Sequence, residues 1–270
     1  MQGDILERRV LITYDQKENA GTTTGGEALH LRHPKTAVPS LYLLIREKLQ
    51  EVHWFKQQLA SWFIGESVSE DGSLYLSSPV DPLFIALPLL EQARMKKGDS
   101  PGMFRGLEEM LEVEGFPGYQ KLFDVFEKTL DMVCEVREAG DTKYYRLDDF
   151  KALAWLCCKV EQASAALKMK GGKAFHGLSD DELRTYSIGL LSEYLPAATW
   201  MKRLSDHYGV DLDAAKKARV LLPVQPLPCA PPPPPPAKTV PVAKGRASSL
   251  AKKGPQPGDR KITSFFARPR

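Results

Sequence analysis

The sequence predicts an α+β fold in three consecutive parts: strands over residues 1–80, mainly helices over 81–222, and a disordered tail over 223–270. In the first part, short β-favouring runs alternate with breaks that contain Thr, Gly or Pro. From residue 82 onward, apolar residues recur at helical spacing. The tail holds 13 of the 21 prolines and almost no periodic apolar pattern, so it cannot bury enough surface to offset the entropy of ordering.

The strand-rich part contains five or six short strands. The clearest hairpin joins a strand over 61–68 to one over 73–77 through the turn Ser69-Glu-Asp-Gly72. This number of strands is typical of a small barrel or sandwich, whose exposed edges must be closed or paired with another chain. The expected strands cover Arg9–Tyr14, Glu27–His33, Ser40–Arg46, Lys48–Lys56, Ser61–Val68 and Ser73–Ser77.

Helical signals begin at Asp81, which can cap a helix, and at Pro82, which suits the first helical position. Short helices are expected within 106–127, and two β-like runs follow, over 131–137 and 142–147. A long amphipathic helix then starts near Asp148, and two further helices are expected over 179–194 and 197–208. Helices, a hairpin and a helix in this order are compatible with a winged-helix module. The apolar face of the long helix should carry Phe150, Leu153, Ala154, Leu156, Cys157, Val160 and Ala163.

The net charge of +3 is divided unevenly along the chain. The tail carries nine Lys or Arg and one acid, a charge near +8, whereas residues 1–222 carry a charge near −5. A basic arm on an acidic body suits a search of polyanions or acidic surfaces, and such arms also serve solubility and nuclear import. No apolar run approaches the ~18–20 residues of a membrane span. The N-terminus does not resemble a secretory signal, so we expect the four cysteines to be reduced thiols.

The sequence contains no pattern of a catalytic or metal-binding site. The acidic pairs at 148–149 and 180–181 fall where helices begin, and helix capping explains them. The glycine pairs lack the spacing of a phosphate-binding loop. Cys157 and Cys158 are adjacent and lack the spacer of a zinc knuckle, and the five histidines show no metal-ligand spacing. We therefore expect no catalytic residue, no metal and no cofactor.

The last residues of the tail break its low-complexity pattern. Ile262 is followed three and four residues later by Phe265 and Phe266, so in one helical turn the three side chains share a face. Two adjacent Phe in a disordered tail have no core to join, and a pocket on a partner explains them. The spacing resembles the clamp-interacting peptide, Gln-x-x-aliphatic-x-x-aromatic-aromatic, which docks on the proliferating-cell nuclear antigen sliding clamp. Asp259 stands in place of the Gln, which removes a hydrogen-bonding amide.

The body also resembles a known family. The run Ser61-Trp-Phe-Ile-Gly-Glu-Ser-Val, followed by Pro79-Val-Asp-Pro-Leu-Phe84, is similar to the central segment of the B subunit of eukaryotic ribonuclease H2. The similarity continues in Lys143-Tyr-Tyr-Arg-Leu147 and in Tyr186-Ser-Ile-Gly-Leu-Leu-Ser-Glu-Tyr-Leu-Pro196. With the terminal Ile-Thr-Ser-Phe-Phe, the resemblance spans nearly the whole chain in the family's order.

The resemblance implies a heterotrimer in which another subunit cuts RNA paired to DNA, or single ribonucleotides embedded in DNA. This chain would be a non-catalytic scaffold whose N-terminal strands interlock with a third subunit in a shared β-barrel, which agrees with the strand count. We expect Trp54, Trp62 and Phe63 to be buried against that partner. The tail would bind the clamp, and we expect the complex in the nucleus with no membrane partner.

A DNA-binding adaptor of replication or repair is the alternative function. The region 142–173 carries enough Lys and Arg to neutralise several phosphates, so a weak contact with nucleic acid is possible there. Acids interleave with these cations, which is also typical of a solvated helix face. An enzyme with an unrecognised site would require metal-dependent turnover by this chain alone. The candidate nucleic-acid contacts are Lys143, Arg146, Lys151 and Lys159.

Overall fold

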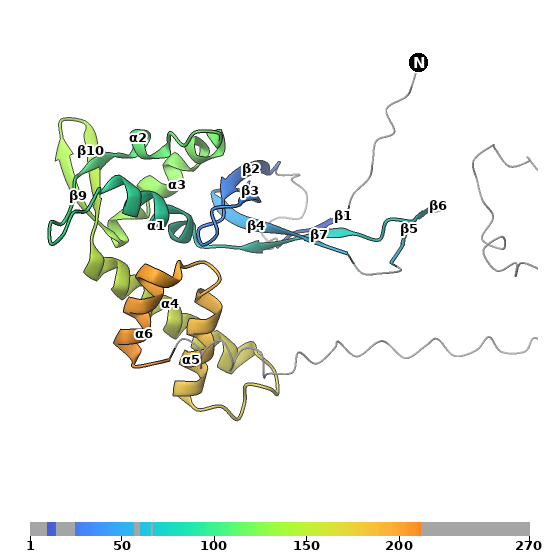
Figure 1. The fold of residues 1–270 in the computed structure, drawn as a ribbon. Coiled ribbons are helices and arrows are strands. Elements are labelled where there is room, and N and C mark those ends of the chain that lie inside the picture. Colours follow the sequence, from blue (N-terminus) through green and yellow to red (C-terminus); the bar gives the residue numbers. More distant parts are fainter. Residues whose placement is uncertain (1–9, 15–24, 57–59, 66, 212–270) are drawn as a thin grey trace, which may run out of the picture. The chain divides into compact units, whose positions relative to one another are not determined.

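The computed structural model describes residues 10–14, 25–56, 60–65 and 67–211. These residues fall into two compact units. The first, which we call the body, contains the described residues up to 56 and from 73 to 211. The second, which we call the hairpin unit, contains the described residues of the segment 57–72. The body is an α+β structure, as the sequence predicts (Figure 1).

The body contains a five-stranded sheet in the order β1-β7-β4-β3-β2. β1 runs parallel to β7, and the other neighbours are antiparallel. Arg46 and Glu47, at φ angles of +48° and +63°, form the tight turn between β3 and β4. One face of the β2–β3–β4 region is buried through Leu29, Tyr42 and Leu49. The strands are β1 Val10–Ile12, β2 Glu27–Arg32, β3 Pro39–Ile45, β4 Lys48–Phe55 and β7 Leu74–Pro79.

The predicted hairpin between 61–68 and 73–77 is wrong. β5 (Trp62–Ile64) instead pairs with β6 (Ser67–Ser69) inside the hairpin unit. Gly65, at a φ of +63°, allows the chain to reverse four residues earlier than the predicted turn. The segment expected to complete the hairpin is β7, which forms a six-residue ladder with β4. On its other side β7 pairs with β1, so neither edge of β7 is left to pair with the 61–68 segment.

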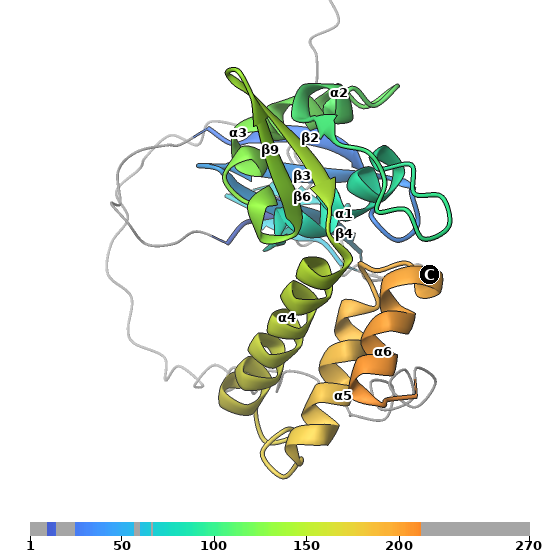
Figure 2. The same ribbon diagram turned by 90° about the vertical axis from the view of Figure 1, so that its left-hand side faces the viewer.

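The chain after residue 81 forms the predicted winged-helix module. Three α-helices and two 3₁₀ segments accompany a three-stranded sheet of order β8-β10-β9, and Gly140, at a φ of +63°, turns the β9–β10 wing. Figure 2 shows the wing beside α2 and α3. The elements are α1 Pro82–Ala93, β8 Arg105–Gly106, α2 Leu107–Leu111, the 3₁₀ segment η1 Pro117–Leu122, α3 Phe123–Glu127, η2 Leu130–Met132, β9 Cys134–Ala139 and β10 Thr142–Leu147.

Three helices form a bundle after the wing (Figure 2). α4 (Asp149–Lys170) packs against α5 (Asp180–Leu191), and their contact includes a buried hydroxyl pair, Ser164 Oγ and Ser187 Oγ, 3.0 Å apart. The π-helical segment η3 (Ala197–Met201) leads directly into α6 (Lys202–Tyr208). None of the described helices is long and apolar enough to span a membrane.

Two helix starts follow the predicted caps, and the third differs. The Asp81 carboxylate accepts a hydrogen bond from the Leu83 amide at 2.9 Å, and Pro82 is the first residue of α1. Asp148 caps α4 by accepting from the Phe150 and Lys151 amides. At α5, Ser179 rather than the acidic pair provides the cap, and the two acids lie in the first turn.

The predicted apolar face of α4 is partly wrong. Phe150 is 87% exposed, and Ala154 is also exposed. The buried stripe is centred on Leu156, and Phe150 lies about 120° around the helix from it. Because the stripe begins at Ala152, one turn inside the helix, the first turn carries Phe150 away from the core. The buried residues are Ala152, Trp155, Leu156, Val160 and Ser164.

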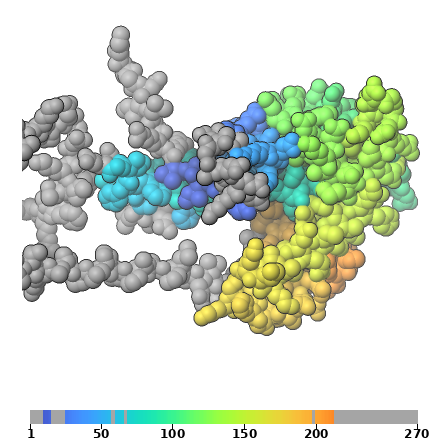
Figure 3. Space-filling view, turned by 180° about the vertical axis from the view of Figure 1, so that it is seen from behind, coloured from blue at the N-terminus to red at the C-terminus, as the bar shows by residue number. Residues whose placement is uncertain are grey.

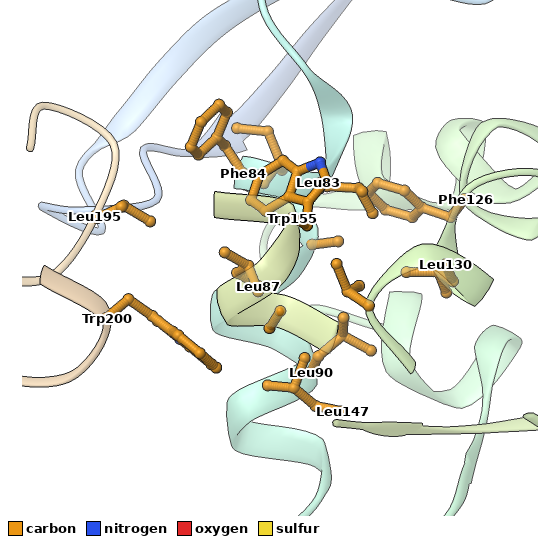
Figure 4. Packing of buried hydrophobic residues seen from close by; sticks show 14 of the residues in the cluster. Leu83, Phe84, Leu87, Leu90, Phe126, Leu130, Leu147, Trp155, Leu195 and Trp200 are labelled. Atoms are coloured by element: carbon orange, nitrogen blue, oxygen red, sulfur yellow. The ribbon is translucent and has the colours of Figure 1, made fainter. Parts of the chain in front are cut away.

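A single hydrophobic core joins the sheet to the helices of the body. Figure 4 shows its centre, where Trp155 of α4 meets Phe84 of α1, with ring centroids 4.9 Å apart in an edge-on arrangement. Such an aromatic contact contributes about 0.5–1.5 kcal/mol beyond the burial of area. Trp200 closes the core from η3 and is 2% exposed. In Figure 3 the blue strands lie directly against the green surface of the winged-helix module.

Candidate functional site

One end of the five-stranded sheet exposes large apolar side chains on both of its faces. Trp54 lies opposite Tyr75, so both project from one face, and the neighbouring Phe55 projects from the other. Trp54 is 60% exposed. Patches of this kind usually mark surfaces that a partner covers. The exposed residues, which we call the apolar strand end, are Leu11, Ile12, Trp54, Phe55 and Leu76.

The hairpin unit carries a second apolar surface. Phe63 of β5 lies opposite Val68 of β6, so both side chains are on the same face of the hairpin. Phe63 is 74% exposed, Val68 is also exposed, and Trp62 is half-buried. A two-stranded hairpin is marginal in water without a surface to pack on. These residues are therefore also suited to contact with a partner.

The three residues predicted for the partner interface thus lie on two separate units. Trp54 belongs to the apolar strand end, whereas Trp62 and Phe63 belong to the hairpin unit. Phe55 and Leu76 share the exposed apolar surface with Trp54 but were not among the predicted residues. The signal was present in the adjacent aromatic residues 54 and 55, because neighbouring residues of a strand face opposite sides. That pair therefore indicated exposed apolar side chains on both faces of the sheet end.

The candidate nucleic-acid contacts on the wing are held by intramolecular partners. Lys143 Nζ donates to Glu127 Oε1 at 3.2 Å, and this hydrogen bond raises the pKa of the ammonium group. Arg146 is ion-paired with Glu135, donates to the Gly102 carbonyl at 3.3 Å, and stacks on Phe104 at 4.3 Å. Its side chain is only 14% exposed, so its structural partners occupy the guanidinium.

The two candidate nucleic-acid contacts on α4, Lys151 and Lys159, are also held by intramolecular partners. Lys151 Nζ donates to the Cys134 carbonyl at 2.8 Å and to the Asp131 carbonyl at 3.2 Å. Lys159 Nζ lies 2.7 Å from Asp81 and 5.8 Å from the centre of the Trp155 ring. Contact with phosphate at either position would require these interactions to be replaced.

A buried carboxylate connects the sheet to the bundle. Glu51 of β4 is 5% exposed, and the Tyr194 hydroxyl donates to its Oε2 at 2.8 Å. His33 Nε2 and His53 Nε2 lie 3.9 and 3.6 Å from the two carboxylate oxygens. Burial, followed by the hydrogen bond to Glu51, raises the pKa of Tyr194 far above its ordinary value, so the hydroxyl remains a donor.

A second charged cluster joins α1, α4 and α6. Asp149 Oδ1 lies 2.6 Å from Arg94 Nη1 and 2.8 Å from Arg203 Nη1, and Asp149 Oδ2 lies 2.8 Å from Lys96 Nζ. The Arg94 side chain is 2% exposed and also pairs with Glu91 at 2.7 Å. Partial burial alone would raise the pKa of Asp149, but hydrogen bonds from Arg203, Lys96 and Arg94 hold it well below its usual range.

The described residues contain no group of three or more His, Cys, Asp or Glu side chains arranged to hold a metal. The three described cysteines are free thiols, and burial raises the pKa of the Cys134 thiol to about 12. The clamp-binding residues predicted in the tail, Ile262, Phe265 and Phe266, lie outside the described residues.

Two family models match consecutive parts of the chain. Residues 18–81 match the triple barrel domain of the Ydr279p protein. Residues 84–176 match the wHTH domain of the Ydr279p protein family, which is described as an RNase H2 complex component. The two matches meet at the capped start of α1.

Proteins named as B subunits of ribonuclease H2 are similar to this chain over much of its length. The B subunit of ribonuclease H2 from Bos taurus is 32% identical over 216 residues, which cover 73% of this chain and 67% of that protein. The protein of the same name from Rattus norvegicus is 30% identical, with 76% of this chain and 70% of that protein covered. The Xenopus laevis protein is 33% identical, with 61% and 58% covered. The chain thus spans less than two thirds of the Xenopus relative.

Proposed function

Because the chain belongs to the family of ribonuclease H2 B subunits, we propose that it is the non-catalytic scaffold of a heterotrimeric ribonuclease H2. In this proposal, a second subunit holds the catalytic carboxylates. It hydrolyses RNA in RNA–DNA hybrids and ribonucleotides embedded in DNA. The third subunit completes a barrel with the strands of this chain.

The apolar strand end is the observation that supports this function best. Leu11, Trp54 and Phe55 occupy a sheet end that the body leaves uncovered, and they lie on two strands that both pair with β7. Strands from a partner would bury these side chains and satisfy the exposed sheet edge in one step. The match of residues 18–81 to a triple barrel domain agrees with this use of the strands.

We also propose that the tail links the complex to the sliding clamp in the nucleus. Its support is the sequence pattern of Ile262, Phe265 and Phe266, which can fill one apolar pocket from a single helical turn. The flanking basic residues suit an acidic clamp surface. The linker from 223 to 258 is long and rich in Pro, so the clamp can be reached without moving the body.

Reconstitution tests the scaffold function directly. The chain is co-expressed with candidate catalytic and barrel-sharing subunits, and the product is separated by size-exclusion chromatography. We expect three subunits to co-elute, and we expect cleavage of an RNA–DNA hybrid with Mg²⁺ only by the complex. Cleavage by this chain alone, after contaminating nucleases are removed, would contradict the proposal. Elution of this chain apart from both subunits would contradict it as well.

The alternative, a DNA-binding adaptor, finds less support. Lys143, Arg146, Lys151 and Lys159 each have an intramolecular partner, which duplex DNA would have to displace. A steep salt dependence of duplex binding by the isolated chain would favour the adaptor, because each neutralised phosphate releases counterions. A shallow dependence together with assembly into the complex would favour the scaffold.

A further inference from the structure

A side chain of the winged-helix module binds the end of the outer edge of β2. Arg32 lies opposite Pro39, which has no N–H, and the Arg32 amide points away from β3. That amide donates to the Tyr119 hydroxyl at 3.1 Å, and the hydroxyl lies 3.5 Å from the Arg32 carbonyl oxygen. Tyr119 is 2% exposed. Its hydroxyl therefore occupies both backbone groups that an added strand would use at this position.

Gly118 allows the module to approach this edge closely. A Cβ at this position would lie 3.1 Å from the His30 carbonyl oxygen and 3.2 Å from Leu31 Cδ2. These distances are shorter than ordinary side-chain contacts, so a larger residue would push η1 away from β2. The 3₁₀ turn thus lies along the edge where a sixth strand would otherwise add.

Two further contacts fix η1 at both ends of β2. Lys121 Nζ lies 3.1 Å from Glu27 Oε1 at the start of the strand. The Arg32 guanidinium stacks on Phe116 at 4.9 Å at the end of the strand. Both pairs are near the surface and contribute modestly. Together with Tyr119 they cover the length of the strand.

The same contacts direct the recognition helix of the winged-helix module toward the sheet. In helix-turn-helix proteins the recognition helix presents its N-terminal residues to the bases in the major groove. Here the corresponding helix is η1–α3, and its N-terminal turn faces β2. Its side chains include Asp124 and Glu127, whereas Lys121 and Lys128 are paired with Glu27 and Glu47. The two lysines of this segment are therefore already neutralised by carboxylates of the sheet.

We propose that Gly118 and Tyr119 act as an edge cap that directs the partner's strand to the opposite edge of the sheet, at β1. The proposal rests on the scaffold function. Among the described strands, β1 pairs only with β7, and its Leu11 and Ile12 are exposed. Its outer edge is continuous with the apolar strand end. An extended segment with apolar side chains fits there, through main-chain hydrogen bonds to β1 and side-chain contacts with the apolar strand end.

Amide hydrogen exchange on the full chain, alone and in the reconstituted complex, tests the cap. Tyr119→Phe keeps the ring but removes the hydroxyl, and Gln120→Ala changes an exposed residue of the same turn as the control. In the chain alone, we expect the Arg32 amide to exchange about fivefold to tenfold faster in Tyr119→Phe and unchanged in Gln120→Ala, because one hydrogen bond is lost. An unchanged Arg32 amide in Tyr119→Phe would overturn the cap.

In the complex, we expect exchange at residues 10–12 to slow by about a hundredfold, whereas exchange at 28, 30 and 32 changes by less than about threefold. Gly118→Val should expose the β2 edge and allow protection to appear there as well. Strong protection of the amides of residues 28, 30 and 32 in the wild-type complex would overturn the proposal that the partner's strand adds at β1. If no complex forms, the scaffold function fails, and the cap is judged from the chain alone.

Discussion

The Tyr194 hydroxyl and the Glu51 carboxylate are 2.8 Å apart, although the two residues are separated by 143 positions in the chain. This hydrogen bond joins β4 to the segment that follows α5. Glu51 is buried, and a buried carboxylate is costly unless donors surround it. The bundle therefore depends on the sheet for a polar contact as well as for the shared core.

Tyr194→Phe should destabilise the body by about 1–3 kcal/mol, because it leaves a buried acceptor without its donor. Chemical denaturation followed by tryptophan fluorescence measures the change. Tyr186→Phe is the matched control, since the Tyr186 hydroxyl has no hydrogen-bond partner among the described residues and its ring packs on Phe175. Equal losses in the two variants would show that the hydrogen bond to Glu51 contributes nothing.

Asp149→Asn should cost about 2–4 kcal/mol, because the buried Arg94 loses one of its two carboxylate partners. Asp180→Asn is the control, since Asp180 also lies in the first turn of a helix but pairs with Lys168 on the surface. That change should cost less than about 1 kcal/mol. Thermal melts of the two variants at neutral pH distinguish these outcomes.

The stability provided by Asp149 should depend on pH in a defined direction. Its pKa in the folded protein is lowered, so the unfolded chain takes up a proton first as the pH falls. The advantage of wild type over Asp149→Asn should be constant above about pH 5 and should shrink below about pH 4. An advantage that grows on acidification would show that the carboxylate is not held by its cationic partners.

Trp54→Ala should weaken assembly with the barrel-sharing subunit while leaving the fold of the chain intact. Trp54 is largely exposed in the body, so its removal creates little cavity. A buried aromatic anchor is typically worth about 2 kcal/mol or more at an interface, which corresponds to at least a tenfold loss of affinity. Phe150→Ala removes another exposed aromatic, from a different surface, and serves as the control. Pull-down titrations that give equal affinities for both variants would exclude the apolar strand end.

Arg146→Gln should lower stability without changing the salt dependence of duplex binding. Its guanidinium is ion-paired with Glu135 and stacked on Phe104, so the loss is internal. A phosphate contact would behave in the opposite way and reduce the salt slope by about one unit. Fluorescence anisotropy with duplex DNA at several salt concentrations provides the slope, and a melting curve provides the stability.

The double change Phe265→Ala and Phe266→Ala should weaken clamp binding by about a hundredfold or more, since each buried ring is worth about 1.5–3 kcal/mol. Asp259→Gln should strengthen binding, because an amide both donates and accepts hydrogen bonds. Calorimetric titration of 255–270 peptides against the clamp measures both effects, with Gln256→Ala, outside the motif and uncharged, as the control. Equal affinity of the wild-type and double-Ala peptides would reduce the tail to a basic solubility arm.

Local signals in the sequence predicted most of the secondary structure. Asp81 and Pro82 together mark the start of α1, because a cap and a fixed φ act within one turn. The β9–β10 wing was likewise predictable from two β-favouring runs around Gly140. The hairpin of 61–77 was predicted wrongly because strand pairing is decided between segments, and β4 competed for β7. Phe150 was misplaced because the buried stripe of α4 depends on where its neighbours lie.

The candidate site was predictable only in part, for the same reason. Trp54 and Phe63 were identified as aromatic residues on strands with too few neighbours. That Tyr119 meets Arg32 could not be predicted, since 87 residues separate them and no local pattern joins them. That Arg146 and Lys151 are held by intramolecular partners also depends on the tertiary structure. The sequence shows both residues as cations that could bind phosphate, whereas in the fold they contact groups of the same chain.

The ion pair between Arg203 and Asp149 has a consequence for local unfolding. α6 is the last helix of the described residues, and it is attached to α4 through this ion pair. The Trp200 ring of the preceding segment η3 is inserted into the core. Detachment of α6 must therefore separate two charges and disturb a buried ring together, so α6 and the first turn of α4 should open as one cooperative unit.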